Sequence, residues 1–162
     1  MFTGIVKSIA KIIDVSDKNG IRTFIIDFNS GFCVDLEVGA SVAVDGVCLT
    51  VTEIVSDMTV KFDIIRQSLL VTSLNEYENG SFVNVERASK EGAEIGGHPL
   101  SGHIDFNTPI VKILKIEDNY CIRLSVSKQW KRYIFPKGYI ALNGASLTIS
   151  QVNKDEGGLK FG

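Results

Sequence analysis

The sequence predicts an all-β protein built from two copies of one antiparallel module, the second copy shorter than the first. Three observations predict this class. Apolar residues alternate with polar ones through most of the chain, Gly, Asn and Asp separate these runs at short intervals, and several segments recur at one fixed spacing. Long runs with helical periodicity are scarce.

Strands are expected wherever apolar residues alternate over four or more positions. The residues between these runs favour tight turns, which is typical of antiparallel sheets. The two best helical candidates are short, Ile64–Leu70 and Lys128–Ile134. The expected strands of the first copy are Thr23–Phe28, Ser41–Val44, Val47–Ile54, Thr59–Phe62 and Phe82–Val85.

The clearest repeat pairs two segments that lie 98 residues apart, Asp45–Thr50 and Asn143–Thr148. Phe2–Val6 and Leu100–Ile104 match at the same offset. Asp-Gly and Asn-Gly suit two-residue hairpin turns, in which both turn residues take positive φ. Generic β alternation can imitate a weak repeat, but matched turns at one offset favour a duplication.

The two copies differ in length. The first occupies residues 1–98, whereas the second, residues 99–162, has 64 residues and ends 34 short of a full copy. The residues from Asp155 onward match the first copy as far as its expected strand Thr59–Phe62. Because a barrel that lacks strands leaves edges unpaired, we expect a C-terminally truncated chain.

Composition argues against several classes of protein. A hydrophobic content of 44% and a charged content of 22% are normal for a packed soluble domain. The net charge of -2, with scattered Lys and Arg, argues against nucleic-acid binding. No signal peptide or membrane span is visible, so we expect a cytoplasmic protein. Cys33, Cys48 and Cys121 lack CxxC spacing, which fits reduced thiols.

Cys48 is the first candidate for chemistry. In the expected strand Val47–Ile54, the apolar residues Val47, Leu49 and Val51 share one face and belong to the core. Cys48 therefore shares the opposite, polar face with Thr50 and Thr52. An accessible thiol is a candidate nucleophile. The alternative is a small side chain that fills an interface, and periodicity alone favours that alternative.

Both histidines lie in the stretch GGHPLSGH, Gly96–His103. Its glycines and proline fix a tight backbone path and permit close approach of a ligand. Histidine supplies a proton donor or acceptor near neutral pH. A metal site is a weaker alternative, because His98 and His103 have no obvious third ligand nearby and no cysteine is close in sequence. A surface loop without a role is the remaining alternative, and the concentration of these residue types favours function.

Ser146 and Thr148 occupy the positions in the second copy that correspond to Cys48 and Thr50 in the first. The second copy thus keeps the polar face but has a hydroxyl in place of the thiol. One interpretation is a pair of related ligand-binding surfaces, of which one is reactive. The other is a duplicated strand whose polar face is solvated.

Several motifs, spread in order from Met1 to about Val152, carry a family resemblance. Together they resemble the riboflavin synthase family of the alpha-subunit type, which is lumazine-binding. The motifs are Met1–Val6, Gly46–Thr52, Val83–Ala88, Gly96–His98 and Ser101–Ile104.

The resemblance implies two six-stranded antiparallel Greek-key barrels, residues 1–98 and 99–162, with the second incomplete. It implies a transferase that converts two molecules of 6,7-dimethyl-8-ribityllumazine into riboflavin and 5-amino-6-(D-ribitylamino)uracil, the last step of riboflavin biosynthesis. No metal or other cofactor is implied, and no nucleic acid or membrane partner. A full-length chain would form a homotrimer, with the active site between the N-terminal barrel of one subunit and the C-terminal barrel of a neighbour.

The resemblance also assigns site residues. The catalytic candidates are Cys48, His103 and Ser41. His103 is the expected base or proton relay for the 7-methyl group of one lumazine, and water or Cys48 is the expected nucleophile at C7 of the other. A last group of contacts is expected beyond Gly162. The expected substrate contacts are Gly4, Ile5, Val6, Cys48, Leu49, Thr50, Asp63, Ile64, Ile65, Arg66, Gln67, Ser68, Gly102, His103, Ile104, Lys137, Ser146, Leu147 and Thr148.

The chain departs from the family pattern at its turns. Asp45 stands where the first copy usually has Asn, and Asn143 stands where the second copy usually has Asp. Gln67 and Ser68 replace a usual Glu-Thr pair. The rival interpretations are a non-catalytic antenna protein that binds one lumazine or flavin, an inactive fragment of the synthase, and a structural β-module without a ligand.

Overall fold

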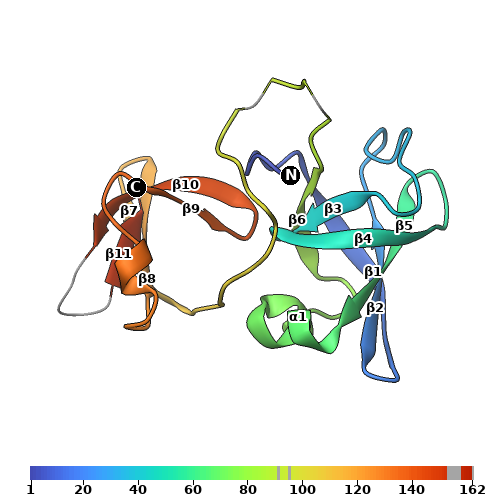
Figure 1. The fold of residues 1–162 in the computed structure, drawn as a ribbon, viewed down its shortest axis with the longest axis horizontal. Helices are drawn as coiled ribbons and strands as arrows, with labels where there is room; N and C mark the ends of the chain where they lie inside the picture. The colour runs from blue at the N-terminus through green and yellow to red at the C-terminus, as the bar shows by residue number, and fades with distance from the viewer. Residues whose placement is uncertain (91, 95, 153–157, 162) are drawn as a thin grey trace. The chain divides into compact units, whose positions relative to one another are not determined.

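The computed structural model describes residues 1–90, 92–94, 96–152 and 158–161. The chain divides into two compact units. The first comprises Met1–Phe106 with Leu142–Ala145, and the second comprises Asn107–Ala141 with Ser146–Gly162. Strands dominate both units (Figure 1), which confirms the all-β class. No helix in the described part of the chain is long and apolar enough to cross a membrane.

The first unit contains a closed, six-stranded antiparallel barrel, as predicted. Its strand order is β1-β2-β5-β4-β3-β6, and β6 closes the barrel by pairing with both β3 and β1. The consecutive strands β3, β4 and β5 pair in turn and β6 returns beside β3, which is a Greek key. The strands are β1 (Ser8–Lys18), β2 (Ile21–Asp27), β3 (Ser41–Val44), β4 (Val47–Ile54), β5 (Thr59–Ile65) and β6 (Phe82–Arg87).

The core of the barrel comes from the alternation seen in the sequence. Phe24 of β2 and Phe62 of β5 are directly paired and fully buried. Val47, Leu49 and Val51 of β4 are buried on the same inner side. Burying each such side chain contributes about 1.5–3 kcal/mol, so this face fixes the register of every strand.

Helical structure is limited to short segments. The α-helix α1 spans Arg66–Val71, and the 3₁₀ helices η1 and η2 span Ser73–Glu76 and Lys131–Tyr133. The predicted helix Ile64–Leu70 begins two residues too early, because Ile64 and Ile65 continue β5 and pair with β2. The predicted helix Lys128–Ile134 is wrong in type, since it is a turn followed by η2.

The second unit holds a five-stranded sheet with the order β7-β8-β11-β10-β9. This order matches β1-β2-β5-β4-β3 strand for strand. Among the described residues no strand takes the place of β6, so the sheet is open and its outer strands β7 and β9 each have an unpaired edge. The strands are β7 (Ile110–Ile116), β8 (Asn119–Ser125), β9 (Tyr139–Leu142), β10 (Ala145–Val152) and β11 (Gly158–Phe161).

The repeat extends to irregularities of the backbone. The β1–β2 ladder has a bulge between Ile12 and Asp14, and the β7–β8 ladder has one 98 residues later. The β4–β5 ladder has a bulge between Val51 and Glu53, and the β10–β11 ladder repeats it at the same offset. Bulges are specific features of a ladder, so their recurrence supports duplication more strongly than strand order alone.

Candidate functional site

The turn that precedes Cys48 is a tight two-residue hairpin, as predicted. Asp45 and Gly46 have φ angles of 44° and 82°, and Asn143 and Gly144 in the second copy have 44° and 81°. Positive φ at both positions is the geometry that Asp-Gly and Asn-Gly favour. The exchange of Asp and Asn between the two turns therefore leaves the backbone unchanged.

Asp45 is buried and fixes this turn to neighbouring elements. Its carboxylate accepts a hydrogen bond from the Asn84 backbone N–H at 2.8 Å and another from the Tyr77 hydroxyl. Burial raises the pKa of Asp45, and these two hydrogen bonds oppose part of the rise. Burial and the bond to Asp45 raise the pKa of Tyr77 to about 12. The phenol therefore stays protonated and donates at neutral pH.

Strand β4 presents its polar face outside the barrel, which confirms the predicted phase. Val47, Leu49 and Val51 are buried, whereas Cys48 is half-buried and Thr50 is exposed. Ser41 of β3 pairs directly with Thr50, and directly paired residues share a face of a sheet. The catalytic candidates Ser41 and Cys48 therefore lie on one outer surface.

Gly102 packs directly onto Cys48. The Cys48 backbone N–H donates to the Gly102 carbonyl at 2.9 Å. A Cβ added to Gly102 would lie 2.7 Å from the Cys48 Cβ and 2.9 Å from the Phe2 ring, so glycine is required here. The exposed His103 follows immediately. The structure thus brings the segment with the candidate base beside the candidate nucleophile, although the two are far apart in sequence.

The N-terminal segment lies against the same region. Phe2 is 2% exposed although it does not belong to the barrel core. It exchanges backbone hydrogen bonds of 2.8 and 2.9 Å with Leu100. The His98 backbone N–H donates to the Thr3 carbonyl at 2.9 Å, and Gly97 leaves room for that carbonyl. Residues 2–3 and 98–100 therefore run side by side.

The first candidate contact segment and its repeat share one local conformation. The Thr3 hydroxyl accepts from the Ile5 N–H at 3.3 Å, and the Ser101 hydroxyl accepts from the His103 N–H at 3.1 Å. The glycines between them, Gly4 and Gly102, have φ angles of 73° and 79°. Both copies thus have a left-handed glycine after a hydroxyl-capped turn. In each copy the protein itself covers this glycine, since Gly4 is buried and Gly102 lies against Cys48 and Phe2.

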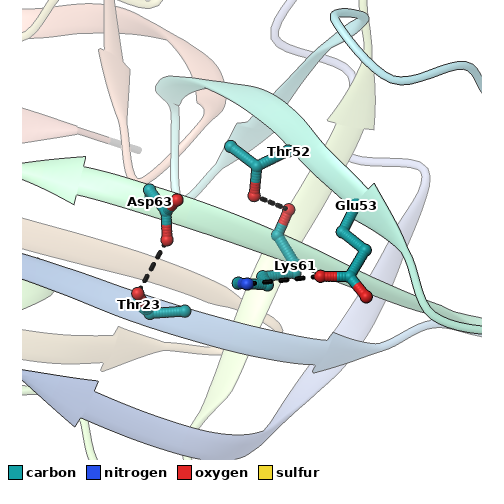
Figure 2. A network of polar contacts seen from close by, with 5 residues as sticks. All are labelled: Thr23, Thr52, Glu53, Lys61 and Asp63. Carbon is teal, nitrogen blue, oxygen red and sulfur yellow. Dashed lines mark hydrogen bonds and ion pairs between the residues drawn. The ribbon is translucent and has the colours of Figure 1, made fainter.

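Asp63 of β5 lies on the outer face of the barrel and is held by a threonine. The Thr23 hydroxyl donates to the Asp63 carboxylate at 2.7 Å (Figure 2). The network has two further polar contacts, which are exposed like the first. Thr52 donates to the Lys61 carbonyl at 3.0 Å, and Lys61 pairs with Glu53 at 3.2 Å. The Thr23 contact orients one carboxylate oxygen and leaves the other available.

The remaining contacts in Asp63–Ser68 span the end of β5 and the start of α1. Ile65, Arg66 and Gln67 are exposed, and Ser68 is half-buried. Ile64 is 1% exposed within the core, so it has only its backbone to offer a ligand on the outer face. The same holds for Leu49, which points into the core.

The second unit carries Lys137 and Ser146–Thr148. Ser146 and Leu147 are half-buried and Thr148 is exposed. Lys137 has a φ of 66° and donates its N–H to the Ile149 carbonyl at 2.8 Å. Its equivalent in the first copy is Gly39, which makes the matching bond to Val51 at 2.9 Å. A lysine therefore occupies a left-handed position that glycine holds in the other copy.

Two side chains with a bearing on this site were missed by the sequence reasoning. Glu86 is a buried carboxylate out of phase with the alternation of β6, and Thr23 holds Asp63. The sequence clue to Glu86 is a charged residue directly after the alternating core residues Val83 and Val85.

The three cysteines are free thiols. No group of three or more His, Cys, Asp or Glu in the described ranges is arranged to hold a metal ion.

Comparison with known proteins agrees with this geometry. A model of the family described as the lumazine binding domain matches residues 3–88 and again residues 101–161. The chain is 44% identical to riboflavin synthase of Escherichia coli (strain K12) over 153 residues, which covers 94% of this chain and 71% of that protein. It is 39% identical to riboflavin synthase of Chlamydia pneumoniae over 155 residues, covering 96% and 75%.

Two solved structures are similar over nearly the whole chain. LumP complexed with riboflavin superposes with a TM-score of 0.88 at 28% identity, covering 99% of this chain and 85% of that one. LumP complexed with 6,7-dimethyl-8-(1'-D-ribityl) lumazine gives a TM-score of 0.84 at 28% identity, covering 99% and 84%. The duplicated barrel strands, the matched motifs and these similarities agree, and the chain belongs to the riboflavin synthase family, whose lumazine binding domain it contains twice.

Proposed function

We propose that this chain is a riboflavin synthase. It catalyses the dismutation of two 6,7-dimethyl-8-ribityllumazine molecules, moving a four-carbon unit from one to the other. The products are riboflavin and 5-amino-6-(D-ribitylamino)uracil. The observation that carries the proposal is the retention of the contact segments in both copies, because a reaction between two identical molecules needs two related sites.

The first lumazine site is proposed on the outer face of the first barrel. Gly4–Val6, Cys48–Thr50 and Asp63–Ser68 supply its contacts, with Ser41 beside Thr50 on the same face. Gly4 is itself buried and leads into the exposed Ile5 and the half-buried Val6, which can meet a flat ring, and the hydroxyls and Asp63 supply polar partners for its edge. The apolar contacts on this face are Ile5, Val6 and Ile65, and ligand sites typically combine such contacts with a few placed polar groups.

The second lumazine is proposed to take its contacts from Lys137 and Ser146–Thr148 of the second unit. Gly102–Ile104, which the family resemblance also assigns to this molecule, belongs to the first unit. The hydroxyl of Ser146 replaces the thiol of Cys48, so the two molecules meet different chemistry. The chain spans 71% and 75% of the length of the two riboflavin synthases compared above. We propose that a longer form of the chain assembles as a homotrimer in the cytoplasm, with each active site formed by two subunits.

In the proposed reaction, His103 accepts or relays the proton lost from the 7-methyl group of one lumazine. Water or the Cys48 thiol adds to C7 of the other lumazine and activates it for attack by the resulting carbanion. Ser41 supplies a hydroxyl on the same face of the sheet as the thiol. Much of the rate is expected from holding the two molecules in register, since orientation alone can contribute several kcal/mol, up to about 7–11.

A non-catalytic antenna protein is the second candidate function. The structural likeness to LumP, solved in complex with riboflavin and with 6,7-dimethyl-8-(1'-D-ribityl) lumazine, favours a protein that binds such a molecule. The intact Ser101–His103 turn and the hydroxyls of Ser146 and Thr148 favour the enzyme, because an antenna that binds one molecule does not need a second set of contacts.

Incubation with 6,7-dimethyl-8-ribityllumazine distinguishes the two. The synthase is expected to convert it to riboflavin, followed by fluorescence and confirmed by chromatography of both products in equal amounts. Boiled protein is the control for slow uncatalysed conversion. Stable binding of the lumazine without product would contradict catalysis by this chain, and would fit the antenna or an inactive fragment of the synthase. The same result with a longer, trimeric form of the chain would support the antenna. Absence of binding would contradict both.

A further inference from the structure

Glu86 is a buried charged residue whose position the strand alternation does not explain. In β6, Val83 and Val85 point into the core, so Glu86 belongs to the outer face of the barrel. Glu86 is nevertheless 4% exposed. A carboxylate buried in this way needs hydrogen-bond partners to offset its loss of water.

The partners of Glu86 all come from the N-terminal segment. Its Oε1 accepts from the Thr3 backbone N–H at 2.7 Å and from the Thr3 hydroxyl at 2.7 Å. Its Oε2 accepts from the Gly4 N–H at 3.0 Å. Hydrogen bonds to a charged acceptor are stronger than neutral ones. Both oxygens are thus engaged in fixing the two residues that precede Ile5.

Glu86 also shares a row of the sheet with Cys48. Ala43 of β3 pairs with Cys48 on one side and with Glu86 on the other. Directly paired residues lie on the same face, so all three side chains line one row of the outer surface. Neighbouring strands are about 4.7–4.9 Å apart, so Glu86 anchors the N-terminal segment two strands away from Cys48.

We propose that Glu86 is a positioning residue for the ligand contacts Gly4–Val6. Its carboxylate holds Thr3 and Gly4 on the outer face and thereby sets where the next residues stand relative to Cys48. Glu86 acts through this segment and not through contact with the ligand. The inference rests on the proposed function, because Gly4–Val6 contact lumazine under that proposal.

The first test is Glu86→Gln in the 162-residue chain. The substitution keeps the size of the side chain, removes its charge and turns an amide NH₂ toward one of the three donors. We expect the Kd for 6,7-dimethyl-8-ribityllumazine, measured by fluorescence titration, to rise about tenfold. The KM is expected to rise with it, and kcat to change less. Glu53→Gln, which removes an exposed carboxylate paired with Lys61, is the control and is expected to bind as the wild type.

The second test measures, without any ligand, how firmly Glu86 holds Thr3 and Gly4. Hydrogen exchange of the Thr3 and Gly4 amides is expected to speed up in Glu86→Gln, with no matching change in β2 or β5. A general loss of stability would speed exchange in those strands as well. Thr3→Ser keeps both hydrogen bonds of the hydroxyl, to Glu86 and from the Ile5 N–H, and is expected to bind lumazine normally, whereas Thr3→Val loses both and is expected to bind more weakly. If Glu86→Gln does not fold, equal binding by this pair still overturns the positioning role.

The outcomes separate the two proposals. Normal lumazine binding by folded Glu86→Gln, or equal binding by the two Thr3 variants, overturns the positioning role. If the wild type binds no lumazine, the proposed function fails and the ligand role of Glu86 fails with it. In that case, selective exchange at Thr3 and Gly4 would still establish Glu86 as the anchor of the N-terminal segment.

Discussion

The two copies of the module follow the same backbone path but differ in how far their apolar side chains are buried. Ile12 of β1 is 0% exposed, whereas Ile110, its equivalent in β7, is 55% exposed. Ile12 lies at the bulge of the β1–β2 ladder, and Ile110 lies at the equivalent bulge of the β7–β8 ladder. The difference is the closing strand β6, which pairs with β1 and has no counterpart among the described residues of the second unit. Turns and bulges therefore set the path of the chain, and closure creates the core.

The copies also differ at the positions proposed to carry chemistry. The first has a thiol at Cys48, a buried carboxylate at Asp45 and glycine at position 39. The second has Ser146, an exposed Asn143 and Lys137 at the equivalent places. A duplicated backbone thus holds two different sets of side chains, as expected if two identical substrates play opposite roles.

The thiol is the difference with the largest expected effect. Cys48→Ala is expected to lower the rate of riboflavin formation on the order of 10²-fold, as loss of a group that acts directly in a reaction does. Ser146→Ala, the matching change in the second copy, is expected to cost less and to act mainly on KM. Steady-state kinetics with the lumazine measures both, and thermal unfolding checks the fold. Near-normal turnover of Cys48→Ala would remove the thiol from the mechanism.

Gly102 offers a sharper structural test, because Gly20 is a matched control. Both have a φ of 79°, but a Cβ at Gly102 meets Cys48 and Phe2, whereas a Cβ at Gly20 meets nothing within 4 Å. Gly102→Ala is expected to lower the free energy of unfolding by about 2–4 kcal/mol, from backbone strain and overpacking together. Gly20→Ala should cost about 1 kcal/mol, from strain alone.

Urea unfolding gives both values, and lumazine titration should show weakened binding for Gly102→Ala alone. Equal effects of the two substitutions would mean that the contact between Gly102 and Cys48 does not matter in solution.

The acidic turn of the first copy predicts a pH dependence that the amide turn of the second cannot have. The pKa of Tyr77 is raised to about 12 in the folded protein from an ordinary value near 10. The unfolded state therefore loses its proton first, so the stability that Tyr77 contributes is complete below pH 10 and is lost as pH rises toward 12. Tyr77 is about half-buried, so solvent screening reduces the size of the effect.

Thermal unfolding between pH 9 and 12 measures this dependence. Tyr77→Phe is expected to unfold more easily at neutral pH, because Asp45 loses a donor, and to show a shallower decline above pH 10. A decline as steep as that of the wild type would assign the alkaline loss to other groups.

Much of the fold could be predicted because it depends on local patterns. The strands Ser41–Val44 and Val47–Ile54 were predicted with their observed bounds, since alternation and the Asp45-Gly46 turn define both ends. The start of α1 was missed because Ile64 and Ile65 are compatible with either a strand or a helix. Pairing with β2, which is a long-range contact, decides between them.

The site could be predicted only in part, because some of its features depend on long-range contacts. The outward phase of Cys48 follows from its own strand, and the family motifs name the contact segments. The packing of Gly102 onto Cys48 and the burial of Glu86 depend on segments that meet through the fold. No local pattern contains that information.

The difference between Lys137 and its equivalent Gly39 is expected to have the smallest effect on stability, and the direction of that effect is clear. It holds a φ of 66° where the first copy has Gly39, and a left-handed conformation costs a side chain about 1–2 kcal/mol. Lys137→Gly relieves this strain but loosens the unfolded chain, so we expect a net gain of about 0.5–1 kcal/mol in urea unfolding. Lumazine binding should weaken if the ammonium contacts the ligand.

Lys137→Ala is the control, because it removes the ammonium and keeps the strain. If the strained backbone at Lys137 serves to hold the ammonium against the ligand, Lys137→Gly should be more stable and should bind lumazine more weakly. A variant that is more stable and binds equally well would show that the strain at position 137 does not serve the ligand.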